Sequence, residues 1–150
     1  MTLRLKFLKS FQHGGIHPRM KDPGGRVVPT VLLVEDDDQV RGILKQILEG
    51  LGYHVLTASN GEEALSTAQD GEGDIKLMIT DVVMPQMSGR ELTEHVLALR
   101  PNLPVLFMSG YTDDAIVRHG LLDEKLNFLQ KPFDSATVAR KVREVLDAAF

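Results

Sequence analysis

The chain has 150 residues, of which 43% are apolar and 25% are charged, a composition typical of one globular domain with room for a tail. It contains no cysteine, which excludes a disulfide scaffold, a thiol nucleophile and a thiolate metal site. No apolar run approaches the roughly 20 residues of a membrane-spanning helix, and basic residues interrupt every candidate core of a secretory signal. The sequence therefore predicts a cytoplasmic protein.

The first 29 residues differ from the rest in charge and composition. They carry six basic residues and one acidic residue, a net charge of +5, which leaves −9 for the rest of the chain. Paired glycines and three prolines predict a flexible linker over residues 12–29. The apolar spacing of residues 2–11 fits either a basic amphipathic helix or a frayed tail, and membrane contact by this tail is not expected. We therefore predict a basic N-terminal tail and linker at 1–29 and a folded domain at 30–150.

From residue 30 onward, short β-rich apolar runs alternate with helical patterns. Strands are predicted at 31–34, 53–57, 75–80, 105–108 and 126–129. Helices are predicted at 40–51, 60–70, 88–99, 112–121 and 134–149, with Asn60, Ser88 and Asp134 as N-terminal caps. Parallel strands need crossover connections, and these are right-handed, so the pattern predicts an open α/β sheet with helices on both faces.

Chemically active residues follow four of the predicted strands. Glu35 and Asp36 follow the first, Asp81 the third, Ser109 the fourth and Lys131 the fifth. In such sheets ligands bind beyond the carboxyl ends of the strands. Buried carboxylates need a compensating cation, and a short set of oxygen ligands favours Mg²⁺. An aspartate beside that cation is suited to attack phosphorus and form an aspartyl phosphate, with the hydroxyl and the ammonium binding the phosphoryl oxygens.

Four segments carry a resemblance to a known family. They are VLLVEDD at 31–37, TDVVMPQMSG at 80–89, FMSGY at 107–111 and FLQKPF at 128–133. With these motifs, residues 30–148 resemble the receiver domain of two-component response regulators, most closely receivers attached to or paired with hybrid sensor histidine kinases. The resemblance implies a flavodoxin-like fold: an open five-stranded parallel sheet in the order 2-1-3-4-5.

The resemblance also implies roles for individual residues. Asp81 is the implied phosphoacceptor, and Ser109 and Lys131 are the implied partners of the phosphoryl group. An Mg²⁺ ion is implied on Glu35, Asp36, Asp81 and the backbone carbonyl of Val83. Ser109 and Phe128 match the switch positions, and the Lys131-Pro132 peptide bond is expected to be cis.

The partners implied are a sensor histidine kinase or a histidine phosphotransfer protein, whose phosphohistidine supplies the phosphoryl group. A homodimer through the face of the fourth helix, fifth strand and fifth helix stays open. We expect no nucleic-acid partner, because the domain is acidic and the chain ends soon after its last helix. Such a domain is a phosphoprotein that promotes its own phosphorylation and dephosphorylation, and not an enzyme in the ordinary sense.

Two other functions would require different residues at particular positions. An Mg²⁺-dependent aspartyl-phosphate phosphatase or phosphotransferase would need a second aspartate two residues after Asp81, and Val83 stands there. A receiver that no longer takes phosphate would lack an acceptor, a metal ligand or the lysine, and all are present. Asp37 and Asp38 are interpreted as charges at a helix start and not as ligands.

Overall fold

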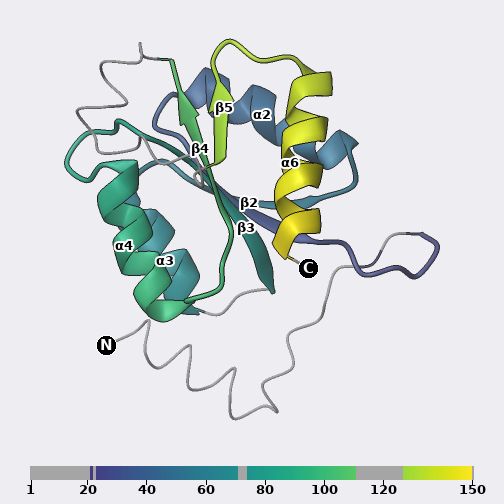
Figure 1. The fold of residues 1–150 in the computed structure, drawn as a ribbon, viewed down its shortest axis with the longest axis horizontal. Helices are drawn as coiled ribbons and strands as arrows, with labels where there is room; N and C mark the ends of the chain where they lie inside the picture. The colour runs from purple at the N-terminus through teal and green to yellow at the C-terminus, as the bar shows by residue number, and fades with distance from the viewer. Residues whose placement is uncertain (1–20, 22, 71–73, 111–126, 150) are drawn as a thin grey trace.

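The structure is a computed structural model, and it describes residues 21, 23–70, 74–110 and 127–149. Figure 1 shows the elements in chain order: β1 (Thr30–Val34), α2 (Asp38–Gly50), β2 (His54–Ala58), α3 (Gly61–Asp70), β3 (Ile75–Asp81), α4 (Gly89–Leu99), β4 (Val105–Ser109), β5 (Asn127–Gln130) and α6 (Ser135–Ala149). All five predicted strands are present, and each of their bounds lies within one residue of the predicted one. The helices expected at 2–11 and at 112–121 lie outside the described residues.

The five strands form one parallel sheet in the order β2-β1-β3-β4-β5, which confirms the predicted flavodoxin-like topology. Helices α3 and α4 lie on one side of the sheet, and α2 and α6 lie on the other (Figure 1). Because β1 and β3 are neighbours and parallel, the residues that follow them meet at one edge of the sheet.

Alternate residues of the central strands enter two separate apolar layers. Val31 and Leu33 of β1 pack in the layer under α2 and α6, whereas Leu32 and Val34 pack in the layer under α3 and α4. All four side chains are fully buried, as a continuous apolar run in a doubly covered strand requires. The predicted apolar face of the last helix is confirmed by its buried residues, Val138, Val142, Val145 and Leu146.

Polar caps begin the helices near the carboxyl edge of the sheet. The Asn60 side chain accepts a hydrogen bond from the Glu63 amide at 2.9 Å, and the Ser88 hydroxyl accepts one from the Glu91 amide at 3.1 Å. Asp134 accepts from the Thr137 amide at 2.7 Å. These three caps were predicted from the sequence. They fix where each helix starts and therefore how the preceding loop leaves the sheet.

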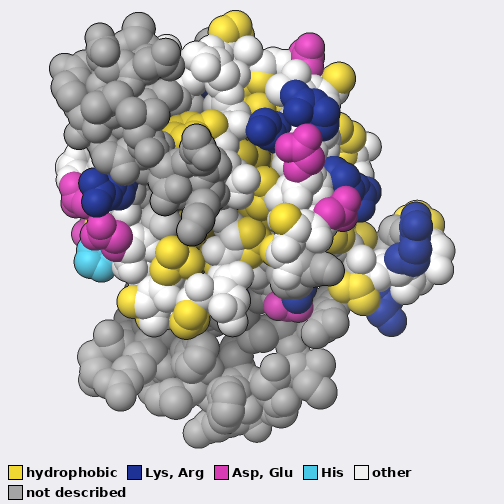
Figure 2. All heavy atoms as spheres, in the orientation of Figure 1, with side chains coloured by type: hydrophobic (Ala, Val, Ile, Leu, Met, Phe, Trp, Pro, Cys, Tyr) yellow, Lys and Arg dark blue, Asp and Glu magenta, His cyan; other side chains and the backbone are white. Residues whose placement is uncertain are grey.

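Two features lie on the surface of this core. Residues 23–29 lead into β1 after a turn that is closed by an isolated antiparallel bridge between Lys21 and Val27. Over α6, basic and acidic side chains are interspersed, as in the pair Arg140–Glu144 (Figure 2). Within the described part of the chain, no helix combines the length and the apolar character that crossing a membrane requires.

Gly89 and Gly42 give a matched pair of predictions. Gly89 begins α4 and lies against the backbone of Asp81, whereas Gly42 lies inside α2 with open space around it. A Cβ at Gly89 would overlap the backbone carbonyl oxygen of Asp81, so we expect Gly89→Ala to lower the free energy of unfolding by about 1–3 kcal/mol. A Cβ at Gly42 in α2 meets nothing within 4 Å, so Gly42→Ala should raise it by about 0.5–1 kcal/mol. Urea unfolding measures both, and an unchanged stability in Gly89→Ala would contradict the close approach.

Candidate functional site

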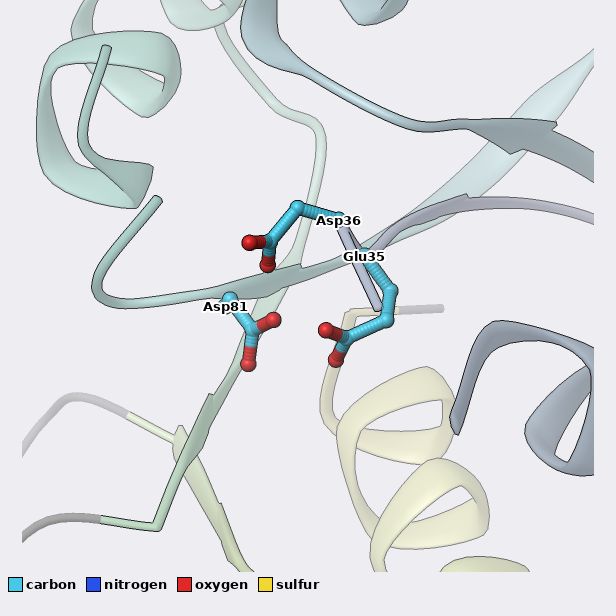
Figure 3. Close-up of side chains that lie close together, drawn as sticks. All are labelled: Glu35, Asp36 and Asp81. Carbon is cyan, nitrogen blue, oxygen red and sulfur yellow. The ribbon is translucent and has the colours of Figure 1, made fainter. Parts of the chain in front are cut away.

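Three carboxyl groups converge at the carboxyl edge of the sheet. Glu35 and Asp36 follow β1, and Asp81 is the last residue of β3. Figure 3 shows these side chains pointing toward one another, and one carboxylate oxygen of each lies within 4.8 Å of the others. Glu35 is 1% exposed and Asp81 is 4% exposed, whereas Asp36 is open to solvent. The adjacent strands bring this acidic cluster together, and two of its members are removed from water.

Lys131 joins the acidic cluster from the far end of the sequence. Its ammonium lies 2.7 Å from the Asp81 carboxylate and 2.9 Å from the Glu35 carboxylate. The Lys131 amide donates to the Ser109 carbonyl at 2.9 Å, which holds the chain after β5 against the end of β4. The Lys131-Pro132 peptide bond is cis, as the resemblance implied. Three strands, β1, β3 and β5, therefore deliver one cation and three carboxyl groups to the same place.

Burial and neighbouring charges shift the acid–base behaviour of these groups. Burial, followed by a hydrogen bond and charge repulsion with Glu35, raises the pKa of Asp81 to about 8, although Lys131 opposes this. Burial also disfavours the charged form of Glu35, but hydrogen bonds with Asp81, Lys131 and the Asp37 amide keep its pKa below the ordinary value. Burial disfavours the Lys131 ammonium too, yet its carboxylate partners keep the Lys131 pKa above the ordinary value. Near neutral pH, Glu35 and Asp81 therefore hold one proton between them.

The donor set of this cluster fits a hard divalent cation. It consists of carboxylate oxygens at short mutual distances, and Lys131 alone does not neutralise three carboxylates. Burial first, and the neighbouring Glu35 second, raise the pKa of Asp81, so a cation beside this carboxylate would favour its ionised form. Mg²⁺ prefers oxygen ligands and keeps several waters, which suits a cluster with one solvent-exposed member.

The remaining predicted site residues lie around this cluster. Ser109 is the last residue of β4 and is 4% exposed. Phe128 lies in β5, partly exposed, with its ring centroid 5.9 Å from that of Phe107 on β4. Val83 is half-buried in the loop after β3 and, like Phe128, packs against the buried pair Val82 and Phe107. The structure thus brings Ser109 and Val83 to the end of the sheet that holds Asp81 and places Phe128 on β5, two strands from Asp81.

The loop that follows Asp81 returns tightly to the sheet. The Gly89 amide donates to the Val82 carbonyl at 2.9 Å, which closes the loop at the start of α4. Gln86 has a φ of 70°, and the Met87 amide donates to the Pro85 carbonyl at 2.8 Å, so a γ-turn bends the loop at Gln86. This geometry fixes the backbone next to Val83. Sequence reasoning placed the cap at Ser88 but not the close approach of Gly89.

Sequence reasoning also missed Arg41. Its guanidinium donates to the backbone carbonyl of Glu35 at 2.8 Å and to the carboxylate of Asp38. Asp37, interpreted as a helix-start charge, is the N-cap of α2 and accepts from the amides of Gln39 and Val40. The signal for Arg41 was present, because a cation near a helix N-terminus opposes the helix dipole and needs a specific partner.

Comparison with known proteins identifies a family that this chain matches. The family model of the response regulator receiver domain matches residues 31–143. The sensor kinase CckA of Brucella abortus is 40% identical over 118 residues, which cover 79% of this chain and 12% of that protein. The response regulator receiver protein CpdR of the same organism is 34% identical over 119 residues, which cover 79% of this chain and 98% of CpdR.

A solved structure agrees with these sequence relatives. The crystal structure of the receiver domain from the hybrid histidine kinase CckA superposes with a TM-score of 0.66 and 38% sequence identity. The match covers 78% of this chain and 98% of that domain. The matches therefore cover 12% of the Brucella abortus kinase, 98% of CpdR and 98% of the solved CckA receiver domain.

The shared proton predicts how stability changes with pH. Asp81 has a pKa of about 8 in the folded chain and 3.8 ordinarily, so between these values the folded state holds the extra proton. The free energy of unfolding should therefore fall as pH rises from about 4 to about 8, by at most about 1.4 kcal/mol per pH unit. Asp81→Asn removes the titrating group and should flatten this dependence, as measured by urea unfolding in the absence of divalent cations.

Asp134→Asn is the matched control for this prediction. The hydrogen bond from the Thr137 amide holds the pKa of Asp134 below its ordinary value, so this carboxylate stays ionised above pH 5. The control should therefore keep the slope of the wild type. An Asp81→Asn slope equal to that of the wild type would contradict the shared proton.

Proposed function

Because the chain belongs to the response regulator receiver family, we propose that it is the phosphoacceptor module of a two-component phosphorelay, with Asp81 as the acceptor. One observation carries this proposal: Asp81 ends a central strand inside a cluster of two further carboxyl groups and the Lys131 ammonium. We propose residues 30–150 as the receiver domain and residues 1–29 as a basic segment that precedes it. The partner would be a sensor histidine kinase or a histidine phosphotransfer protein.

The transfer step uses the Asp81 carboxylate as a nucleophile. An Asp81 oxygen forms a bond to the phosphorus of the partner's phosphohistidine, the P–N bond breaks, and its electron pair stays on the imidazole nitrogen. Asp81 must give up its proton before this step. Lys131 already contacts Asp81 at 2.7 Å, so its ammonium is placed to bind a phosphoryl oxygen on that carboxylate. Ser109, buried at the end of β4, would donate its hydroxyl to another.

An Mg²⁺ ion would be held by Glu35, Asp36, Asp81 and the backbone carbonyl of Val83. When bound, it supplies positive charge that offsets the phosphoryl charge. Asp36 is exposed and would bind it directly, while Glu35 keeps its bond to Lys131 and would act through water. The alternative of a phosphatase of similar build is not favoured, since the half-buried Val83 offers no acid or base two residues after Asp81.

The phosphoacceptor is tested directly by substitution. Asp81→Asn cannot form an acyl phosphate, so it should show no phosphoryl adduct by intact-protein mass spectrometry after treatment with acetyl phosphate and Mg²⁺. Asp147→Asn is the matched control, because it makes the same chemical change at an exposed position near the end of α6 and should be phosphorylated like the wild type. An adduct of equal yield on Asp81→Asn would place the acceptor elsewhere.

We further propose that phosphorylation changes the surface predicted for the fourth helix, the fifth strand and the fifth helix; of these, β5 and α6 are described, and the helix predicted at 112–121 lies outside the described residues. The phosphoryl group would draw the Ser109 hydroxyl toward Asp81, and the partly exposed Phe128 ring would turn inward into the space released. The Phe107 ring, 5.9 Å away and 2% exposed, would form the wall against which it packs. The energy available is the difference in contacts between two states, on the order of 1–3 kcal/mol.

Nuclear magnetic resonance with beryllofluoride and Mg²⁺ tests this switch without turnover of the phosphate. We expect chemical-shift changes that extend from Asp81 to Phe128 and along residues 127–149. Asp81→Asn, which cannot accept the beryllofluoride adduct, is the control and should show none of the distant changes. Shifts confined to the neighbours of Asp81 would leave a phosphate carrier without a switch.

A further inference from the structure

Arg41 contacts the loop that carries two of the three acidic residues of the cluster. From α2, its guanidinium donates to the Glu35 backbone carbonyl at 2.8 Å and to the Asp38 carboxylate. The Arg41 side chain is 22% exposed and its bond to the Glu35 carbonyl is partly buried, whereas its bond to Asp38 lies at the surface. A charged donor on a backbone carbonyl in such surroundings makes one of the stronger hydrogen bonds available to a protein.

Hydrogen bonds hold both the backbone and the carboxylate of Glu35. Its amide donates to the Ala58 carbonyl at the end of β2 at 3.1 Å, and its carbonyl accepts from Arg41. Its carboxylate accepts from the Asp37 amide at 3.1 Å and from Lys131 at 2.9 Å. Of these contacts, the bond from Arg41 is the one that acts on the peptide leading to Asp36.

That peptide decides where Asp36 points. The Glu35 carbonyl and the Asp36 amide belong to one planar group, so a bond that fixes the carbonyl also fixes the backbone entering Asp36. On the other side, Asp37 is anchored as the N-cap of α2 through the Gln39 amide at 2.9 Å. Asp36, whose own side chain is exposed, therefore stands between two fixed points, and one of them is made by Arg41.

We propose that Arg41 is a positioning residue of the cation site: it orients the peptide between Glu35 and Asp36 so that both carboxylates face Asp81. This inference rests on the proposed function, since it concerns the same Mg²⁺ ion. The positioning role and simple electrostatics predict opposite effects of losing Arg41 on the affinity for Mg²⁺. A guanidinium near a divalent cation repels it, so losing the charge of Arg41 should tighten Mg²⁺ binding, whereas losing its positioning should weaken binding.

The experiment is an Mg²⁺ titration by isothermal calorimetry on the full chain. We expect Arg41→Gln to bind Mg²⁺ about tenfold more weakly than the wild type, as is typical when a residue that orients a metal ligand is lost. Arg41→Lys keeps the charge and one donor for the Glu35 carbonyl, so it should bind more tightly than Arg41→Gln. Arg140→Gln removes the same charge from an exposed ion pair on α6 and should match the wild type.

A second measurement separates positioning from general stability. In the apo form of Arg41→Gln, hydrogen exchange should become faster at the Asp37 amide, which donates to the Glu35 carboxylate. The amide of Met78 in the buried strand β3 should exchange as in the wild type. Faster exchange at both sites would indicate a global loss of stability and overturn the positioning role.

The outcomes distinguish this inference from the proposed function. Mg²⁺ binding by Arg41→Gln that equals or exceeds that of the wild type overturns the role of Arg41. If Arg41→Gln does not fold, Arg41→Ala decides, since it removes the donor to the Glu35 carbonyl and keeps a strong helix former in α2; an affinity equal to that of the wild type overturns the role. Asp36→Asn tests the site itself: if it binds Mg²⁺ as the wild type does, the proposed ligand set is wrong, whatever the Arg41 variants do.

Discussion

The burial of two carboxyl groups at the ends of adjacent strands is the constraint on which the rest of this structure depends. Glu35 and Asp81 are nearly inaccessible to solvent and belong to one acidic cluster. Two buried negative charges so close together are unfavourable unless a cation or a proton compensates them. Lys131 supplies one positive charge, and the proton on Asp81 supplies the rest at neutral pH. The fold therefore has to deliver a lysine to the ends of β1 and β3 from a position 96 residues beyond Glu35.

The strand order meets this requirement. Placing β1 beside β3 makes the carboxyl pair, and adding β4 and β5 on the same side brings the chain after β5 back to it. The amide of Lys131 then bonds to the Ser109 carbonyl, so the position of the ammonium depends on the backbone of β4. Lys131 therefore has two roles: its ammonium compensates the charge of Asp81 and Glu35, and its amide joins the chain after β5 to the end of β4.

Much of this could be predicted from the sequence, because the signals are local. The run Val31–Val34 is continuously apolar, so it had to be a strand covered on both faces, and caps such as Ser88 and Asp134 mark helix starts by residue type alone. The strand order could not be predicted from local signals of this kind. Alternating strands and helices are compatible with several orders, and only the resemblance to receiver domains selected the observed one.

What escaped prediction depends on contacts between groups that the sequence does not place side by side. Arg41 is recognisable in the sequence as a cation near a helix start, but only the path of the preceding loop brings the Glu35 carbonyl within its reach. Gly89 looks like any residue after a cap until the backbone of Asp81 is seen against it. The raised pKa of Asp81 likewise results from burial and from Glu35, so no reading of residue types along the chain would have given it.

In the function proposed above, the same excess of negative charge would connect metal binding, proton release and phosphorylation in one small cluster. A proton on Asp81 and a divalent cation both relieve the repulsion between Glu35 and Asp81, so each weakens the binding of the other. A cation held there would favour the ionised form of Asp81, which is the form that the proposed transfer needs. The repulsion between the buried carboxylates would then be the free energy by which Asp81 responds to a ligand. Lys131, which contacts Asp81 at 2.7 Å, would pass that response to the chain between β5 and α6.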